Sequence, residues 1–108
     1  MSKTLDELRA QAIEVSSAYR KQNADQGFVD WSASDYVQGF MTDVGDLAKQ
    51  IMIHEKKRGG DGDRQKIEHE LADCLYSVLV IAHELNIDLG SAFESTMKEL
   101  KTNLGDHP

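Results

Sequence analysis

Residues 37–85 read VQGFMTDVGDLAKQIMIHEKKRGGDGDRQKIEHELADCLYSVLVIAHEL, and apolar residues recur in them every three or four positions. This spacing is typical of amphipathic helices. The glycine-rich residues 59–63 interrupt the pattern, and the cations at residues 56–58 suit the C-terminus of a helix. The sequence therefore predicts two helices joined by a short turn, which can pack as an antiparallel hairpin.

The chain outside this hairpin carries the same helical period, from Leu5 to about residue 21 and from Leu89 to Leu100. No segment alternates with the period of two that marks half-buried strands. We therefore predict an all-α fold, a compact four-helix bundle that forms a single domain over residues 1–108. Side chains that can cap a helix precede all four: Thr4 with Glu7 three residues later, Ser32 or Ser34, Asp61 or Asp63, and Asp88.

The composition limits the classes of function. The 108 residues include 19 acidic and 12 basic ones, which gives a formal net charge of −7. This balance argues against a nucleic acid polymer as partner, because such binding depends on Lys and Arg at the phosphates. A phosphorylated ligand would need a metal cation between itself and the acidic protein.

The N-terminal residues are charged, and no run approaches the ~18 apolar residues of a membrane span. We therefore expect no membrane partner and a cytoplasmic location. The single cysteine, Cys74, excludes an intramolecular disulfide framework and a multi-cysteine zinc site. We expect its thiol to be buried and structural.

Two pairs of carboxylates lie on the predicted hairpin. Asp43 and Asp46 are three residues apart, as are Glu70 and Asp73, so each pair shares one helical face. Both pairs are equally distant in sequence from residue 58, and an antiparallel hairpin would bring all four carboxylates to about the same height. Asp43 and Glu70 also lie among the apolar positions, so we expect them to point inward.

Like charges gathered in a partly buried site repel one another, and a bound cation would relieve that repulsion. Carboxylate oxygens suit Mg²⁺, with Mn²⁺ as a substitute. Acidic pairs at this spacing are also common on solvated helix faces. The spacing alone leaves both interpretations open.

The motifs Asp43-Val-Gly-Asp46-Leu-Ala and Glu70-Leu-Ala-Asp73-Cys-Leu resemble a family pattern, E-x-x-E, a spacer and E-x-x-D. That pattern belongs to the MazG-like family of all-α nucleoside triphosphate pyrophosphohydrolases. The resemblance continues through Leu85-Asn-Ile-Asp88-Leu and covers roughly residues 31–100. Each acidic motif is a weak signal separately, but their order and their flanking residues make the combination fairly specific.

The resemblance implies Mg²⁺-dependent hydrolysis of nucleoside triphosphates, including non-standard deoxynucleotides, to nucleoside monophosphate and pyrophosphate. Such an activity would serve nucleotide-pool housekeeping. Asp43, Asp46, Glu70 and Asp73 would be both the metal ligands and the catalytic carboxylates. The resemblance also implies a homodimer or homotetramer, with active sites near the subunit interfaces.

Three more residues are candidates for substrate binding. Trp31 precedes the second predicted helix, where some relatives place an aromatic residue that stacks on the base; the alternative is a packing anchor. Lys56 and Lys57 could reach substrate phosphates from the end of that helix. Complementation of the helix dipole explains these two cations equally well.

The chain departs from the family pattern at several positions. Asp43 and Asp46 replace two glutamates, so their carboxylates reach one methylene less far. Thr42 replaces a further glutamate, and Thr96 and Leu100 stand where many relatives have lysine and asparagine. The alternative function is therefore a catalytically impaired relative that binds nucleotide or metal, or a helical protein-interaction module.

Overall fold

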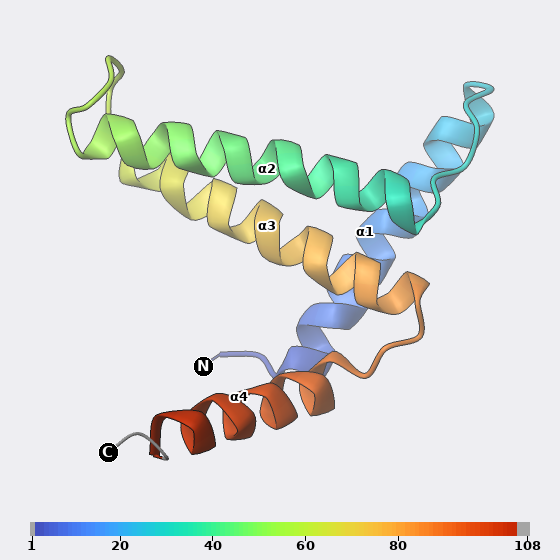
Figure 1. The fold of residues 1–108 in the computed structure, drawn as a ribbon. Coiled ribbons are helices and arrows are strands. Elements are labelled where there is room, and N and C mark those ends of the chain that lie inside the picture. The colour runs from blue at the N-terminus through green and yellow to red at the C-terminus, as the bar shows by residue number, and fades with distance from the viewer. Residues whose placement is uncertain (1, 106–108) are drawn as a thin grey trace.

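The computed structural model describes residues 2–105, which form four α-helices and no strand (Figure 1). These are α1 (Leu5–Asp25), α2 (Ala33–His54), α3 (Arg64–Glu84) and α4 (Leu89–Gly105). The predicted all-α class with four helices is therefore confirmed. None of these helices is long and apolar enough to cross a membrane.

The helices begin where the capping residues predict. Thr4 and Glu7 form a reciprocal capping box, with the Glu7 amide donating to Thr4 Oγ1 at 3.2 Å. Ser32, rather than Ser34, caps α2, and Asp63, rather than Asp61, caps α3 by accepting from the Gln65 amide at 2.9 Å. Asp88 accepts from the Ser91 amide at 3.1 Å ahead of α4. Local side-chain chemistry therefore sets these helix starts.

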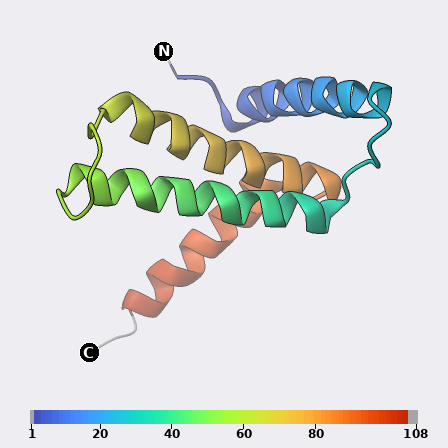
Figure 2. The same cartoon turned by 90° about the horizontal axis from the view of Figure 1, so that it is seen from above.

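α2 and α3 form the predicted antiparallel hairpin (Figures 1 and 2). One hydrogen bond links the facing sides of the two helices: Ser77 Oγ donates to Asp43 Oδ2 at 2.8 Å. The midpoint between these two residues in the sequence is residue 60, whereas the prediction centred the hairpin at residue 58. Asp43 therefore faces a residue about one helical turn beyond Asp73, so the carboxylates of the two helices are offset along the hairpin and not level as predicted.

α1 packs on α3 rather than running beside α2 along its length. Ala12 of α1 meets Leu79 and Val80 of α3 in a buried cluster, and the half-buried Tyr36 and Tyr76 pack against this cluster. α1 extends four residues beyond the predicted end at residue 21 and stops at Asp25. Gly27 follows with a positive φ of 82°, which turns the chain toward α2.

The prediction of a compact bundle is wrong for the single chain. The Cα radius of gyration is 17.1 Å, whereas about 13 Å is expected for a compact domain of this length. α4 meets the other helices at its start, where Leu89 packs against the cluster of Ala12, Leu79 and Val80, and from there it projects away from the hairpin (Figure 2). The physical reason is that within residues 2–105 no other helix covers the apolar face of its later turns, so these residues stay exposed: Phe93, Met97, Leu100 and Leu104.

The turn between α2 and α3 predicts a sharp difference between two adjacent glycines. A Cβ atom on Gly60 would lie 2.7, 3.0 and 3.1 Å from three side-chain atoms of the buried Ile53, whereas a Cβ on Gly59 would meet nothing within 4 Å. We expect Gly60→Ala to lower the free energy of unfolding by about 1–3 kcal/mol. Gly59→Ala, the matched control, should change it by less than about 0.5 kcal/mol. Urea unfolding followed by circular dichroism measures both, and equal stabilities would contradict the packing of Ile53 against the turn.

Candidate functional site

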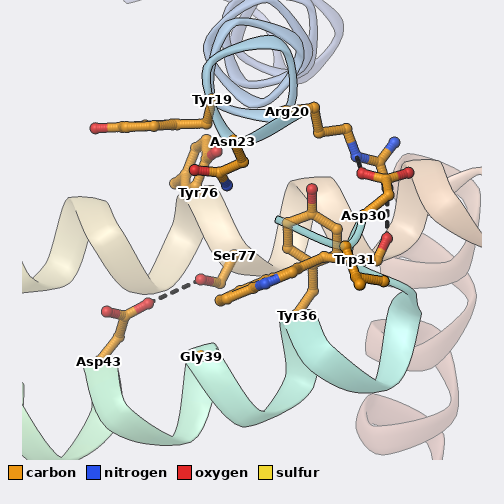
Figure 3. A pocket seen from close by; sticks show the side chains of 11 residues that line it. Tyr19, Arg20, Asn23, Asp30, Trp31, Tyr36, Gly39, Asp43, Tyr76 and Ser77 are labelled. Carbon is orange, nitrogen blue, oxygen red and sulfur yellow. Dashed lines mark hydrogen bonds and ion pairs between the residues drawn. The ribbon is translucent and has the colours of Figure 1, made fainter. Parts of the chain in front are cut away.

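A cavity of about 280 Å³ lies where α1, α2, α3 and the segment before α2 meet (Figure 3). All three tyrosines of the chain and its single tryptophan line this cavity. The remaining lining residues are Arg20, Asn23, Val29, Asp30, Gly39, Asp43 and Ser77. Four of the seven aromatic side chains of the chain thus surround one opening, which suits a planar ligand.

Trp31 is fixed on one wall of this cavity. Its ring meets that of Tyr36 edge to face, with centroids 5.3 Å apart and planes at 70°. The indole lies over Gly39, where an added Cβ would come within 3.3 Å of its Cζ3. Because Trp31 is still 46% exposed, it both anchors the segment before α2 and presents an open aromatic surface. The two interpretations of Trp31 are therefore compatible.

The guanidinium of Arg20 connects α1 with α3 and with the segment before α2. It contacts Glu84 of α3 at 2.8 Å and Asp30 at 3.2 Å, and it donates to the backbone carbonyl of Trp31 at 2.8 Å. It also lies 5.3 Å from the centroid of the Tyr36 ring. One side chain of α1 therefore holds the position of the Trp31 segment relative to α3 (Figure 3).

Of the predicted metal ligands, the structure places Asp43 at the edge of the cavity and Glu70 with Asp73 on α3. Glu70, Asp73 and the neighbouring His69 each offer a ligand atom, and these atoms lie within 4.8 Å of one another. His69 Nε2 is 3.1 Å from Asp73 Oδ2. Asp43, Glu70 and Asp73 are half-buried, whereas Asp46 is exposed and outside this group.

The carboxylates of this group influence the pKa of the neighbouring Cys74 thiol. The residue is half-buried, less than expected, and burial raises the pKa of its thiol. The negative charges of Asp43, Glu70 and Asp73 raise the Cys74 pKa further. The charges of three of the four predicted ligands, one from α2 and two from α3, therefore influence the same thiol.

Lys56 and Lys57 lie at the other end of α2. Both belong to the turn that follows the helix, and Lys57 Nζ is 3.2 Å from Glu55 Oε1. The 22 residues of α2 span about 33 Å, and Figure 1 shows the turn after α2 at the opposite end of this helix from the segment that precedes it. The two lysines are therefore remote from Trp31 within one chain. Their role in substrate binding stays a prediction.

Several residues of the site were not predicted. His69 has a signal in the sequence, because a residue four positions before Asp73 lies on the same helical face. Tyr19, Arg20 and Asn23 have none, because they reach the cavity only through the packing of α1 on α3. Ser77 is one turn beyond Asp73, and its link to Asp43 depends on the register of the hairpin.

A family model described as the MazG nucleotide pyrophosphohydrolase domain matches residues 32–104. The match runs from the cap of α2 into the last turn of α4 and includes all four predicted carboxylates. Trp31 and α1 lie outside it. Comparisons with curated proteins and with solved structures give no match.

The contacts of Arg20 predict a strong local effect of its removal. Arg20→Gln should lower the free energy of unfolding by about 1–3 kcal/mol, because Glu84 loses its partner and the Trp31 carbonyl loses its donor. The emission of Trp31, the only tryptophan, should shift as its surroundings loosen. Arg9→Gln is the matched control, since Arg9 makes one exposed contact of 3.9 Å with Asp6. Unchanged Trp31 emission in Arg20→Gln would show that Arg20 does not position the segment.

Proposed function

Because the chain belongs to the MazG nucleotide pyrophosphohydrolase family, we propose that it hydrolyses nucleoside triphosphates between the α- and β-phosphates. The products are a nucleoside monophosphate and pyrophosphate, and non-standard deoxynucleotides are included among the substrates. Such a reaction removes unwanted nucleotides from the pool. The observation that carries the proposal is the position of Asp43, which belongs both to the aromatic cavity and to the group of carboxylates around Cys74.

The residues present fit a divalent cation. Glu70, Asp73 and His69 offer ligand atoms within 4.8 Å of one another, and these side chains would hold a divalent cation once their ligand atoms move closer together. Asp43 would supply an oxygen from the facing helix, and Asp46 would join if it turned inward from its exposed position. We assign Mg²⁺ to this site, with Mn²⁺ as a substitute, because most of the donors are carboxylate oxygens.

The substrate lies across the two halves of the site. Its base stacks on Trp31 in the cavity, and its phosphates extend along the hairpin past Ser77 toward Asp73, which is one helical turn away. A bound divalent cation would polarise the phosphoryl group and lower the pKa of the attacking water. One of the four carboxylates orients that water. The hydrogen bond from Ser77 Oγ fixes the orientation of the Asp43 carboxylate.

We propose that the chain works as a homodimer or homotetramer. Exposed apolar side chains follow one face of α4, among them Phe93 and Leu100 at 58% and 51% exposure. A second copy that covers this face would supply burial that the single chain lacks. Because Lys56 and Lys57 are remote from Trp31 in one chain, any contact of theirs with the triphosphate of a bound nucleotide depends on such an assembly.

The exposed position of Asp46 favours a second candidate, a relative that binds metal or nucleotide without turnover. Asp46 is one methylene shorter than the glutamate of the family pattern and lies outside the group formed by Glu70, Asp73 and His69. If Asp46 does not reach the cation, ion binding persists while the geometry for attack is incomplete. A helical interaction module would bind neither ion nor nucleotide.

A nucleotide panel with Mg²⁺ or Mn²⁺ tests the reaction. The expected products are pyrophosphate and nucleoside monophosphate, and Glu70→Gln should reduce the rate at least about 100-fold because a charged ligand is lost. Glu68→Gln is the matched control on the same helix, since Glu68 makes only a surface contact of 3.7 Å with Arg64. Its rate should equal that of the unchanged protein.

Each other outcome of this panel has a defined meaning. Release of orthophosphate would reject cleavage between the α- and β-phosphates. No release from a protein that Mg²⁺ nevertheless stabilises against heat would favour the binding relative. If neither Mg²⁺ nor Mn²⁺ raises the melting temperature and no product is released, the helical interaction module is favoured.

The assembly is tested on α4. Phe93→Glu places a charge in the middle of the exposed apolar face and should reduce the molar mass measured by light scattering at micromolar concentration. Ser95→Glu adds the same charge on the opposite side of the helix and should leave the mass unchanged. A single-chain mass for the unchanged protein would reject the homo-oligomer.

A further inference from the structure

Asn23 lines the cavity with a polar side-chain amide. It is half-buried on the inner face of α1 and lines the cavity beside Tyr76 (Figure 3). Its backbone carbonyl accepts from the Phe28 amide at 2.9 Å, which fixes the main chain at this position. Its side-chain amide makes no hydrogen bond to any other part of residues 2–105.

The charged groups of the cavity are already paired. Arg20 holds Asp30 and Glu84, and Asp43 accepts from Ser77. Among the lining side chains, Asn23 is the one that offers a donor and an acceptor side by side. The Asn23 side chain is half-buried but its amide is open to solvent in the free chain, so a ligand with matching groups would replace the water at this amide.

The walls also restrict what kind of ligand enters. A free organic cation is disfavoured, because the guanidinium of Arg20 already lies over the ring of Tyr36. The volume of about 280 Å³ is just below the range of about 300–1,000 Å³ that holds drug-sized ligands. One neutral heteroaromatic ring system fits this description, and a whole nucleotide does not.

We propose that Asn23 pairs with the hydrogen-bonding edge of the base whose face stacks on Trp31, and that it thereby determines which bases are accepted. The proposal rests on the function proposed above. Stacking on an aromatic ring is available to every base and therefore gives little selectivity. A bidentate amide contact discriminates, because a base that presents the wrong groups leaves the amide unpaired.

The test compares two substitutions that change the hydrogen-bonding groups of residue 23 in different ways. Asn23→Asp leaves two acceptors, which match only an edge with two adjacent donors, N1–H and N2–H of guanine. Asn23→Leu keeps the approximate size and removes all pairing. The neighbouring cation Arg20, one turn earlier on α1, keeps the new carboxylate ionised.

Binding of AMP, GMP, CMP and UMP is measured by titration calorimetry, and rates are measured for the four corresponding triphosphates. Asn23→Asp should favour GMP over each other monophosphate by about tenfold or more, as judged from the ratio of their dissociation constants. Asn23→Leu should raise the dissociation constant of the preferred monophosphate by about tenfold and make the four dissociation constants similar. Asn103→Asp, on the exposed face of α4, is the matched control and should change neither. Circular dichroism confirms that each variant is folded.

The two proposals fail separately. If the base ratios move in Asn23→Asp while no triphosphate is cleaved, the assignment of Asn23 stands and the hydrolytic function falls. If Glu70→Gln abolishes cleavage while both Asn23 variants keep the original base ratios, the function stands and Asn23 is excluded. Absence of monophosphate binding to the unchanged protein overturns the assignment as well.

Discussion

α3 is packed from two sides, and the rest of the structure depends on this double contact. Leu79 and Val80 meet Ala12 of α1, while Ser77 donates to Asp43 of α2. These buried positions come within four consecutive residues of α3, so the rotation of this helix about its axis is fixed by both neighbours at once. Tyr76, next to Ser77, then necessarily faces the space between α1 and α2. The cavity and the register of the carboxylates are two consequences of the same packing.

The distribution of charge around this packing is uneven. Burial raises the pKa of the Cys74 thiol, and the negative charges of Asp43, Glu70 and Asp73 raise it further. On the other side of the cavity, the guanidinium of Arg20 is shared between Asp30 and Glu84. In the proposed function, a nucleoside triphosphate would bring its phosphates to this negatively charged part of the hairpin. A divalent cation removes this conflict, which is why metal binding and substrate binding would depend on each other in this chain.

The hairpin was predictable because local rules determine it. Helical periodicity, the glycine-rich turn and the capping residues Thr4, Ser32, Asp63 and Asp88 each act within a few residues of chain. The inward positions of Asp43 and Glu70 follow from the same periodicity, and both are half-buried.

The α1 side of the cavity was not predictable from the sequence, because Tyr19 and Asn23 reach the cavity that Trp31 also lines only through the angle at which α1 crosses α3. The course of α4 was missed for a related reason. An apolar face such as that of Phe93 and Leu100 shows that a helix will pack, but not whether it packs within its own chain.

The two halves of the site therefore have different structural origins. The carboxylates come from two helices that are adjacent in the sequence and joined by a short turn, and the family match covers all of them. The cavity residues Tyr19 and Asn23 come from α1, which lies outside that match. Asp43 is the residue shared by the cavity and by the carboxylates around Cys74. Since substitutions that share no partners act nearly independently, the proposed choice of base by residues of α1 would change without disturbing the groups that would hold the metal.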